Sequence, residues 1–224
     1  MKTFHDLQEG VYDPNILKAF FLAGGPGSGK SYVVSRTTGG LGMKIVNSDD
    51  AFEKLLRDAG LSLKMPPEET PKYLPYKAAR TRAKELTAKR KQNYIEGRLG
   101  LIIDGTGRDF DRISKQAREL ENLGYDTHMI FVNTSLDVAL QRNEKRARSV
   151  PTSVVTNYWK SVQQNIGKFS SFFKGNFVII DNNSPDENMM QQVFKRVRHL
   201  AKKKVQNSRG KSWIAQQLQM KKRA

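Results

Sequence analysis

The chain has 224 residues, and its 39 Lys and Arg residues outnumber its 22 Asp and Glu residues, which gives a formal net charge of +17. This length suits one α/β domain with appendages, and 38% hydrophobic residues argue against global disorder. The absence of cysteine excludes disulfides, thiolate metal sites and a cysteine nucleophile, and fits a reducing intracellular setting. Apolar runs are too short for a membrane-spanning helix, and residues 1–10 lack the apolar core of a secretory signal.

Five short apolar runs predict β-strands, at residues 19–23, 44–46, 99–103, 127–132 and 177–180. Segments with apolar residues at helical spacing predict α-helices, at residues 30–37, 51–59, 76–96, 111–122, 136–148, 153–166 and 186–204. Strands that alternate with helices form a parallel sheet with helices on both faces, and continuous apolar runs suit strands that are covered on both sides. We therefore predict an α/β fold with a five-stranded parallel sheet.

The pattern also predicts how the chain is divided. Residues 1–15 are polar and are expected to form an N-terminal leader or peripheral segment. Residues 16–204 are expected to form the folded domain, with a proline-rich connector and a basic helix inserted at 62–98. Residues 205–224 are expected to form a loose basic tail or a short helix around residues 213–220.

The positive charge is concentrated in two segments. Residues 195–224 contain 11 basic and no acidic residues, and residues 72–98 contain nine basic and two acidic residues, so the rest of the chain is close to neutral. Basic segments on a neutral body are the electrostatic footprint of a polyanion partner, and we predict a nucleic acid rather than a membrane. The alternative is a solvated helix face and a frayed tail.

Residues 24–31, GGPGSGKS, satisfy the pattern G-x-x-x-x-G-K-[ST] between a predicted strand and a predicted helix. Glycines let backbone N–H groups turn toward phosphate oxygens, and the helix N-terminus favours negative charge. We expect Lys30 to reach the β- and γ-phosphates of ATP or another NTP, and the Ser31 hydroxyl to ligate Mg²⁺. The alternative is a glycine-rich turn. The residues predicted to bind the nucleotide in this loop are Gly25, Pro26, Gly27, Ser28, Gly29, Lys30 and Ser31.

Carboxylates follow two of the predicted strands. Asp49 and Asp50 follow residues 44–46, and Asp104 follows residues 99–103. The carboxyl ends of parallel strands are where open α/β sheets bind ligands. One acid of the first pair is a candidate to accept the proton of an attacking hydroxyl, and Asp104 is a candidate ligand near Mg²⁺. The alternatives are an N-cap for the helix at 51–59 and a turn carboxylate.

Arg142 and Arg146 are four residues apart and are expected on one face of the helix at 136–148. Guanidinium groups stabilise the charge that develops on phosphate oxygens during phosphoryl transfer. The alternative is a solvated charged face that includes Glu144.

Together these motifs resemble the 5′-hydroxyl polynucleotide kinases of tailed phages and the zeta-toxin-type P-loop kinases. The resemblance covers about residues 17–166 and rests on the order of four motifs: GGPGSGKS, N-S-D-D at 47–50, D-G-T at 104–106, and L-x5-RN-x2-R followed by V-P at 136–151. It implies an adenylate-kinase-like fold with a mobile lid. It also implies that Asp49 is the general base and that Arg142 and Arg146 clamp the donor phosphates from the lid.

The sequence departs from the polynucleotide kinases on the acceptor side. Those enzymes carry an arginine three residues after the base, where it contacts the substrate phosphate, and this chain has Phe52 there. Arg80, Arg82 and Arg108 are candidates to replace that contact. The first ten residues resemble capsid-targeting leaders of phage internal head proteins, with cleavage expected between Glu9 and Gly10. That resemblance implies packaging in the virion interior in addition to the cytoplasm of the infected host cell.

We therefore predict an ATP- and Mg²⁺-dependent kinase that phosphorylates a hydroxyl of a nucleic acid, at a 5′-end or on a modified base. A kinase of a small metabolite, such as a nucleotide sugar, explains the motifs but leaves the basic segments unused. A nucleic-acid-binding phage internal protein with a vestigial nucleotide site is the alternative from another class. Asn182 and Asn183, after the last predicted strand, are candidates to line the nucleotide base.

Overall fold

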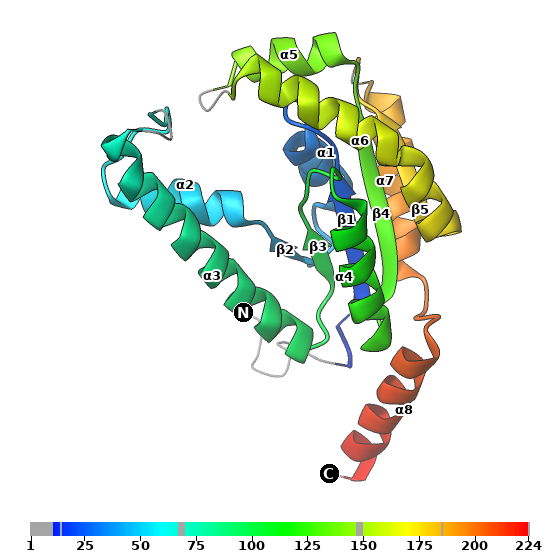
Figure 1. The fold of residues 1–224 in the computed structure, drawn as a ribbon. Helices are drawn as coiled ribbons and strands as arrows, with labels where there is room; N and C mark the ends of the chain where they lie inside the picture. Colours follow the sequence, from blue (N-terminus) through cyan, green and yellow to red (C-terminus); the bar gives the residue numbers. More distant parts are fainter. Residues whose placement is uncertain (1–10, 14, 67–69, 147–149, 185, 224) are drawn as a thin grey trace.

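The computed structural model describes residues 11–13, 15–66, 70–146, 150–184 and 186–223. Five parallel strands form one sheet in the order β2-β3-β1-β4-β5. The strands are β1 (Lys18–Ala23), β2 (Lys44–Val46), β3 (Leu101–Ile103), β4 (Asp126–Asn133) and β5 (Phe177–Asp181). The sheet is flanked by helices (Figure 1), so the predicted fold class is confirmed.

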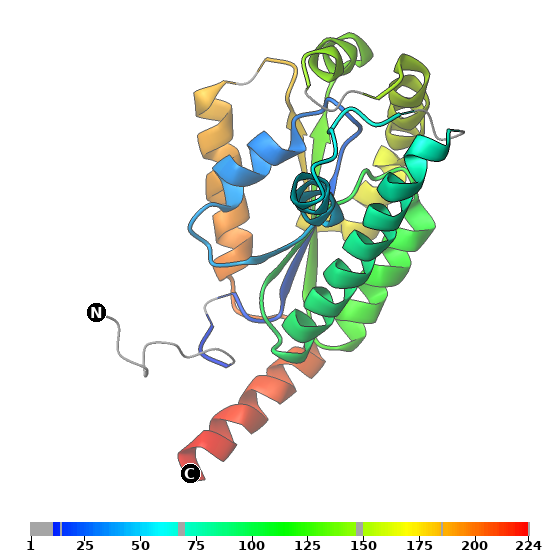
Figure 2. The same cartoon turned by 90° about the vertical axis from the view of Figure 1, so that its left-hand side faces the viewer.

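The α-helices are α1 (Lys30–Thr38), α2 (Ser48–Asp58), α3 (Leu74–Glu96), α4 (Phe110–Asn122), α5 (Leu136–Glu144), α6 (Thr152–Phe173), α7 (Glu187–Lys202) and α8 (Ser208–Arg223). Figure 2 shows α1 and α7 on one side of the sheet and α4 and α6 on the other. Alternate residues of β1 enter the two cores, since Phe20 packs in the cluster under α1 and α7, and Phe21 packs in the cluster under α4 and α6. Every residue of β1 is buried.

Helix α6 continues to Phe173, beyond its predicted end at residue 166. The boundaries of α2 and α5 differ from the predicted ones for local reasons. Helix α2 begins at Ser48 because the side chain of Asn47 accepts the backbone N–H of Asp49 and caps the helix. The predicted N-cap role of Asp49 or Asp50 is therefore wrong. Helix α5 ends at Glu144, because the Asn143 side chain bonds to both the N–H and the carbonyl of Val150 and holds the returning chain.

Helices α2 and α3 extend beyond the β2 edge of the sheet as an arm (Figure 1) and pack on each other around a core of their own. Phe52 and Leu56 of α2 meet Tyr76 and Ala83 of α3 in this small cluster. The arm includes most of the predicted insertion, and it places a basic helix next to the end of β2.

The C-terminal segment is helical, so the expectation of a loose tail is wrong and the helical alternative is confirmed over a longer range, as α8. The Asp126 carboxylate accepts the backbone N–H groups of Gln206 and Asn207 and pairs with Lys18 at 2.6 Å. Trp213 and Ile214 of α8 pack against the cluster under α4 and α6. Helix α8 thus lies at the end of the sheet where β4 begins.

Two sequence predictions concern other parts of the chain. The predicted leader and its cleavage position at residues 9–10 lie outside the described residues. Within the described ranges, no helix is both long enough and apolar enough to cross a membrane.

Candidate active site

The loop between β1 and α1 lies at the carboxyl ends of the strands, where its glycines meet neighbouring segments. Gly27 and Gly29 have φ angles of 78° and 83°, the left-handed region that glycine adopts without strain. A Cβ atom at Gly27 would collide with the carbonyl of Ala139 in α5, and one at Gly29 would collide with the side chain of Asn182. The loop therefore needs glycine at both positions, and Gly27 and Gly29 also line a cavity at this end of the sheet.

Lys30 is the first residue of α1, and its ammonium lies inside the loop. Its Nζ atom donates to the carbonyl of Gly24 at 2.5 Å, with the carbonyl of Gly25 at 3.4 Å. Burial lowers the pKa of Lys30, while the carboxylate of Asp104 opposes that shift and Arg146 adds to it. The predicted phosphate-binding lysine is thus held in the loop, and its charge interacts with that of the predicted metal ligand Asp104.

Asp49 lies in the first turn of α2, at the end of β2. Its Oδ1 atom accepts a hydrogen bond from Arg80 of α3 at 2.6 Å, and the guanidinium of Arg80 also lies 4.3 Å from the centre of the Phe52 ring. The neighbouring Asp50 has a raised pKa, first because of burial and then because of Glu53 and Asp49. A guanidinium from another helix therefore pairs with Asp49 and stacks on Phe52.

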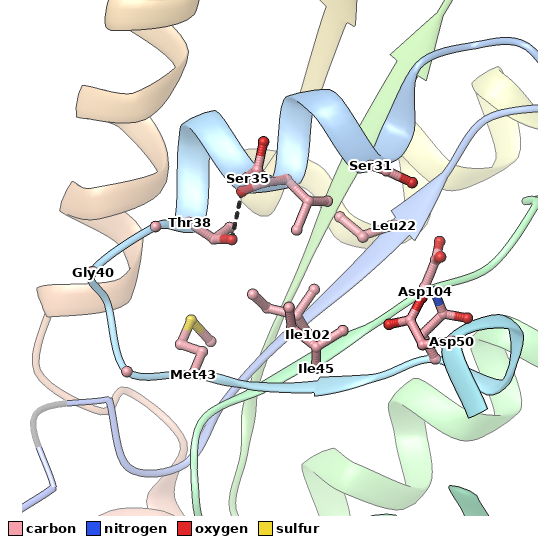
Figure 3. Close-up of a pocket in the computed structure, with 14 residues that line it drawn as sticks. Leu22, Ser31, Ser35, Thr38, Gly40, Met43, Ile45, Asp50, Ile102 and Asp104 are labelled. Atoms are coloured by element: carbon pink, nitrogen blue, oxygen red, sulfur yellow. Dashed lines mark hydrogen bonds between the residues drawn. The ribbon is translucent and has the colours of Figure 1, made fainter. Parts of the chain in front are cut away.

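Asp104 follows β3 and lies near the loop. Burial raises the pKa of Asp104, Lys30 opposes the shift, and Asp49 and Asp50 add to it. The Oδ1 atom of Asp104 is buried and has no hydrogen-bond partner within the described part of the chain. Ser31, Asp50 and Asp104 line one end of a cavity of about 340 Å³ between α1 and β2 (Figure 3). Its remaining wall is mostly apolar, with Met43 and Ile102 in the same view.

Arg142 and Arg146 both line a cavity of about 240 Å³ together with the loop. Arg142 lies in α5 and donates through Nη2 to the carbonyl of Asn183 at 3.3 Å, while its Nη1 is buried and has no partner among the described residues. Arg146 follows the end of α5, so the expectation that both arginines share one helix face is wrong. The two guanidinium groups nevertheless reach the same cavity. The loop residues that line it are Gly25, Gly27, Gly29, Lys30 and Ser31.

These residues fit a nucleotide with Mg²⁺. The unpartnered atoms of Asp104 and Arg142 are an acceptor and a donor that a metal-bound water and a phosphate oxygen would satisfy. Over the described ranges, no group of three or more His, Cys, Asp or Glu residues could hold a metal ion. Mg²⁺ would therefore depend on Ser31 and Asp104 together with phosphate and water oxygens, as is usual for this ion.

The sequence did not reveal which arginine stands beside the proposed base. Arg80 is beside Asp49, whereas Arg82 pairs with Glu85 on the exposed face of α3 at 3.3 Å. The Arg108 guanidinium lies 4.4 Å from the centre of the Tyr158 ring. The only sequence signal for Arg80 was its place in the basic helix, which does not distinguish it from its neighbours.

The sheet order and the glycine-rich loop define a P-loop kinase-like fold. The chain belongs to the AAA domain family (AAA_33), whose model matches residues 20–169. The comparison with curated proteins finds no match.

Solved structures share the fold at low identity. A candidate kinase from Chloroflexus aurantiacus is 15% identical with a TM-score of 0.58, and the match covers 86% of this chain and 98% of that one. The PezAT toxin–antitoxin structure from Streptococcus pneumoniae is 15% identical with a TM-score of 0.53, over 83% and 87%. A chain of the Pnkp1/Rnl/Hen1 RNA repair complex is 17% identical with a TM-score of 0.51, over 75% and 49%.

Proposed function

We propose that this protein is an ATP- and Mg²⁺-dependent kinase that transfers the γ-phosphate to a hydroxyl group. The observation that carries the proposal is the shared site: the Lys30 ammonium lies inside the loop, and the charges of Asp104 and Asp49 act on it. Arg142 and Arg146 line the same loop cavity. Phosphoryl transfer needs such a set, in which cations surround the donor and a carboxylate faces the acceptor.

Each side chain has a role in the proposed reaction. The loop N–H groups and Lys30 bind the β- and γ-phosphates, and Arg142 and Arg146 stabilise charge on the transferred group. The Asp49 carboxylate accepts the proton of the acceptor hydroxyl as its oxygen bonds to the γ-phosphorus. The bond between that phosphorus and the β–γ bridging oxygen breaks, and ADP leaves. Mg²⁺, when bound by Ser31 and Asp104, neutralises phosphate charge.

The proposed acceptor is a nucleic acid, at a 5′-hydroxyl or at a hydroxyl of a modified base. The support is the basic arm beside Asp49, because Arg80 contacts the proposed base and other cations of α3 are exposed on the same helix. These are Lys77, Arg82, Lys84, Lys89 and Arg90. A metabolite kinase of the zeta-toxin type is the second candidate, favoured by the 340 Å³ cavity that opens beside Asp50 and Asp104.

Transfer of labelled γ-phosphate to a panel of acceptors tests the proposal. The panel contains single-stranded DNA and RNA with 5′-hydroxyl ends, hydroxyl-modified DNA, and nucleotide sugars. We expect Asp49→Asn to lower kcat at least 100-fold for the preferred acceptor, because the proton acceptor is lost. Asp58→Asn is the matched control, since Asp58 lies on the same helix and forms an ion pair with exposed Lys54 at 3.1 Å. Activity of Asp49→Asn equal to that of the control would contradict the mechanism, and no transfer to any acceptor would favour a vestigial site.

The predicted packaging in a capsid is a separate proposal, supported only by the resemblance of residues 1–10 to phage leader segments. Mass spectrometry of purified virions tests it. We expect a chain that begins at Gly10, and a virion without the chain or with intact Met1 would contradict the leader prediction.

A further inference from the structure

The carboxyl end of β5 contacts the phosphate loop through one buried amide. Asn182 is 2% exposed, and its Nδ2 atom donates to the carbonyl of Ser28 at 2.7 Å. Its own backbone N–H donates to the carbonyl of Asn133 at 2.8 Å, which fixes Asn182 to the end of β4. The amide lies so close to Gly29 that no Cβ atom would fit between them. The loop conformation is thus held from a strand that is 154 residues away in sequence.

Asn183, the next residue, contacts Arg142, which lines the 240 Å³ cavity together with the phosphate loop. The Oδ1 atom of Asn183 accepts the backbone N–H of Ser135, the N-cap of α5, at 2.6 Å. Its carbonyl accepts the hydrogen bond from Arg142, and its Nδ2 atom donates to Asp181 at 2.6 Å, which orients the amide. Asn183 therefore links the start of α5 and the guanidinium of Arg142 to the same strand end.

We propose that Asn182 and Asn183 are positioning residues that hold the phosphate loop and Arg142 in their nucleotide-binding geometry before the nucleotide binds. This inference rests on the proposed function in one respect, namely that the cavity lined by the loop and Arg142 binds ATP. A loop that is already ordered binds its ligand more tightly, because no ordering entropy is lost on binding. Loss of the Asn182 amide would leave the Ser28 carbonyl without this donor and would free the loop.

The test compares Asn182→Leu with Asn176→Leu in the full-length protein. Asn176 is the matched control, because its Nδ2 atom makes a similar hydrogen bond to the carbonyl of Thr127 at 3.0 Å, just before β5 begins. Hydrogen–deuterium exchange of residues 24–31 is measured without nucleotide, and ATP·Mg²⁺ affinity is measured by calorimetry. We expect Asn182→Leu to speed exchange in the loop and to weaken ATP binding about 5- to 10-fold, and the control to do neither.

Further outcomes separate this inference from the kinase proposal. If the wild-type protein fails to bind ATP, the kinase proposal fails, while exchange in the nucleotide-free loop still reports on Asn182. Equal loop exchange in the Asn182→Leu and Asn176→Leu variants would overturn the inference. Asn182→Ala replaces the leucine variant if circular dichroism shows that the latter is unfolded. Asn183→Ala is expected to speed exchange in residues 135–142 rather than in the loop, and unchanged exchange there would overturn the role of Asn183.

Discussion

The Asp49 carboxylate is held by a residue of another helix. Arg80 donates to it at 2.6 Å and stacks on Phe52, so the guanidinium has both an electrostatic and a packing reason to stay there. We expect Arg80→Ala to lower kcat/KM for the acceptor about tenfold, because the proposed base loses its orientation, while KM for ATP stays unchanged. Steady-state kinetics with each substrate varied in turn measures both effects, and Arg80→Lys is expected to recover part of the loss.

The control for this prediction is Arg82→Ala, which removes an exposed guanidinium from the same helix and the same basic segment. Arg82 pairs with Glu85 and not with the site. If both alanine variants lower acceptor kcat/KM equally, Arg80 acts only through general charge. If Arg80→Ala raises KM for ATP instead, its role lies on the donor side and the assignment is wrong.

For single residues, the sequence predicted the positions that local motifs set and missed the contacts that depend on how the elements pack. Lys30 and Ser31 could be placed because a loop motif fixes its own geometry, and Asp104 could be placed because parallel strands end at one edge. The Arg80 contact depends on how α3 packs against α2 around Phe52, which no spacing rule gives. Asn182 likewise reaches the loop only because β4 and β5 pair in this register.

Among the secondary-structure elements, strand β4 places a titratable side chain, the ring of His128, in the core. His128 is 3% exposed and stacks on Phe20 with ring centres 4.6 Å apart, and its two nitrogens have no hydrogen-bond partners in the described part of the chain. Burial, followed by the charge of Lys18, lowers the pKa of His128 to about 4. Because this folded-state pKa lies below the unfolded one of about 6.5, the stability from the neutral ring is present above pH 6.5 and is lost as pH falls toward 4.

We therefore expect His128→Phe to reduce the acid sensitivity of the fold. Between pH 7 and pH 5 the wild-type protein is expected to lose up to about 2 kcal/mol more unfolding free energy than the variant, in urea denaturation at each pH. Phenylalanine keeps the stacking on Phe20 and removes the proton-binding nitrogens. His199→Phe, which removes a histidine ring that is exposed on α7, is the matched control. Parallel pH profiles for the wild-type protein and His128→Phe would contradict the account.

The boundaries of the helices, like the contacts of single residues, could be predicted from the sequence only where local signals set them. Strand β2 matches its predicted range, and helices α1 and α4 match within one residue. For α1 and α4, glycines follow the helix within two residues of its end and stop it. Helix α5 is shorter than predicted because its end is set by the side-chain contacts of Asn143 with Val150, which lie beyond the helical pattern. Its early end separates Arg146 from the helix, yet both arginines line the loop cavity.

For the whole molecule, the basic segments of the sequence lie partly together. Helix α3 begins in the arm and passes Asp49 with Arg80, and the residue that follows it closely, Arg98, lies over the ring of Trp213 in α8 (Figure 1). The outer face of α7 adds Lys195, Arg198 and Lys202, which line a shallow cavity of about 400 Å³. A nucleic acid that occupies the active site would contact α3 first, so the α7 face would contribute only to longer strands.

Neutral substitutions on α7 and α3 test these two surfaces one at a time. Removal of α8 is no substitute for them, because Val205 is buried and Trp213 packs on the core. We expect glutamine at Lys195, Arg198 and Lys202 to weaken binding of long single strands and to reduce the slope of log affinity against log salt by about 0.7 per lost phosphate contact. Phosphorylation of a short acceptor should stay unchanged. Glutamine at Lys77, Lys84 and Lys89, which are exposed on α3, should lower acceptor kcat/KM at both lengths. A salt slope that neither triple variant alters would exclude both surfaces as polyanion sites and would leave a metabolite as the better acceptor.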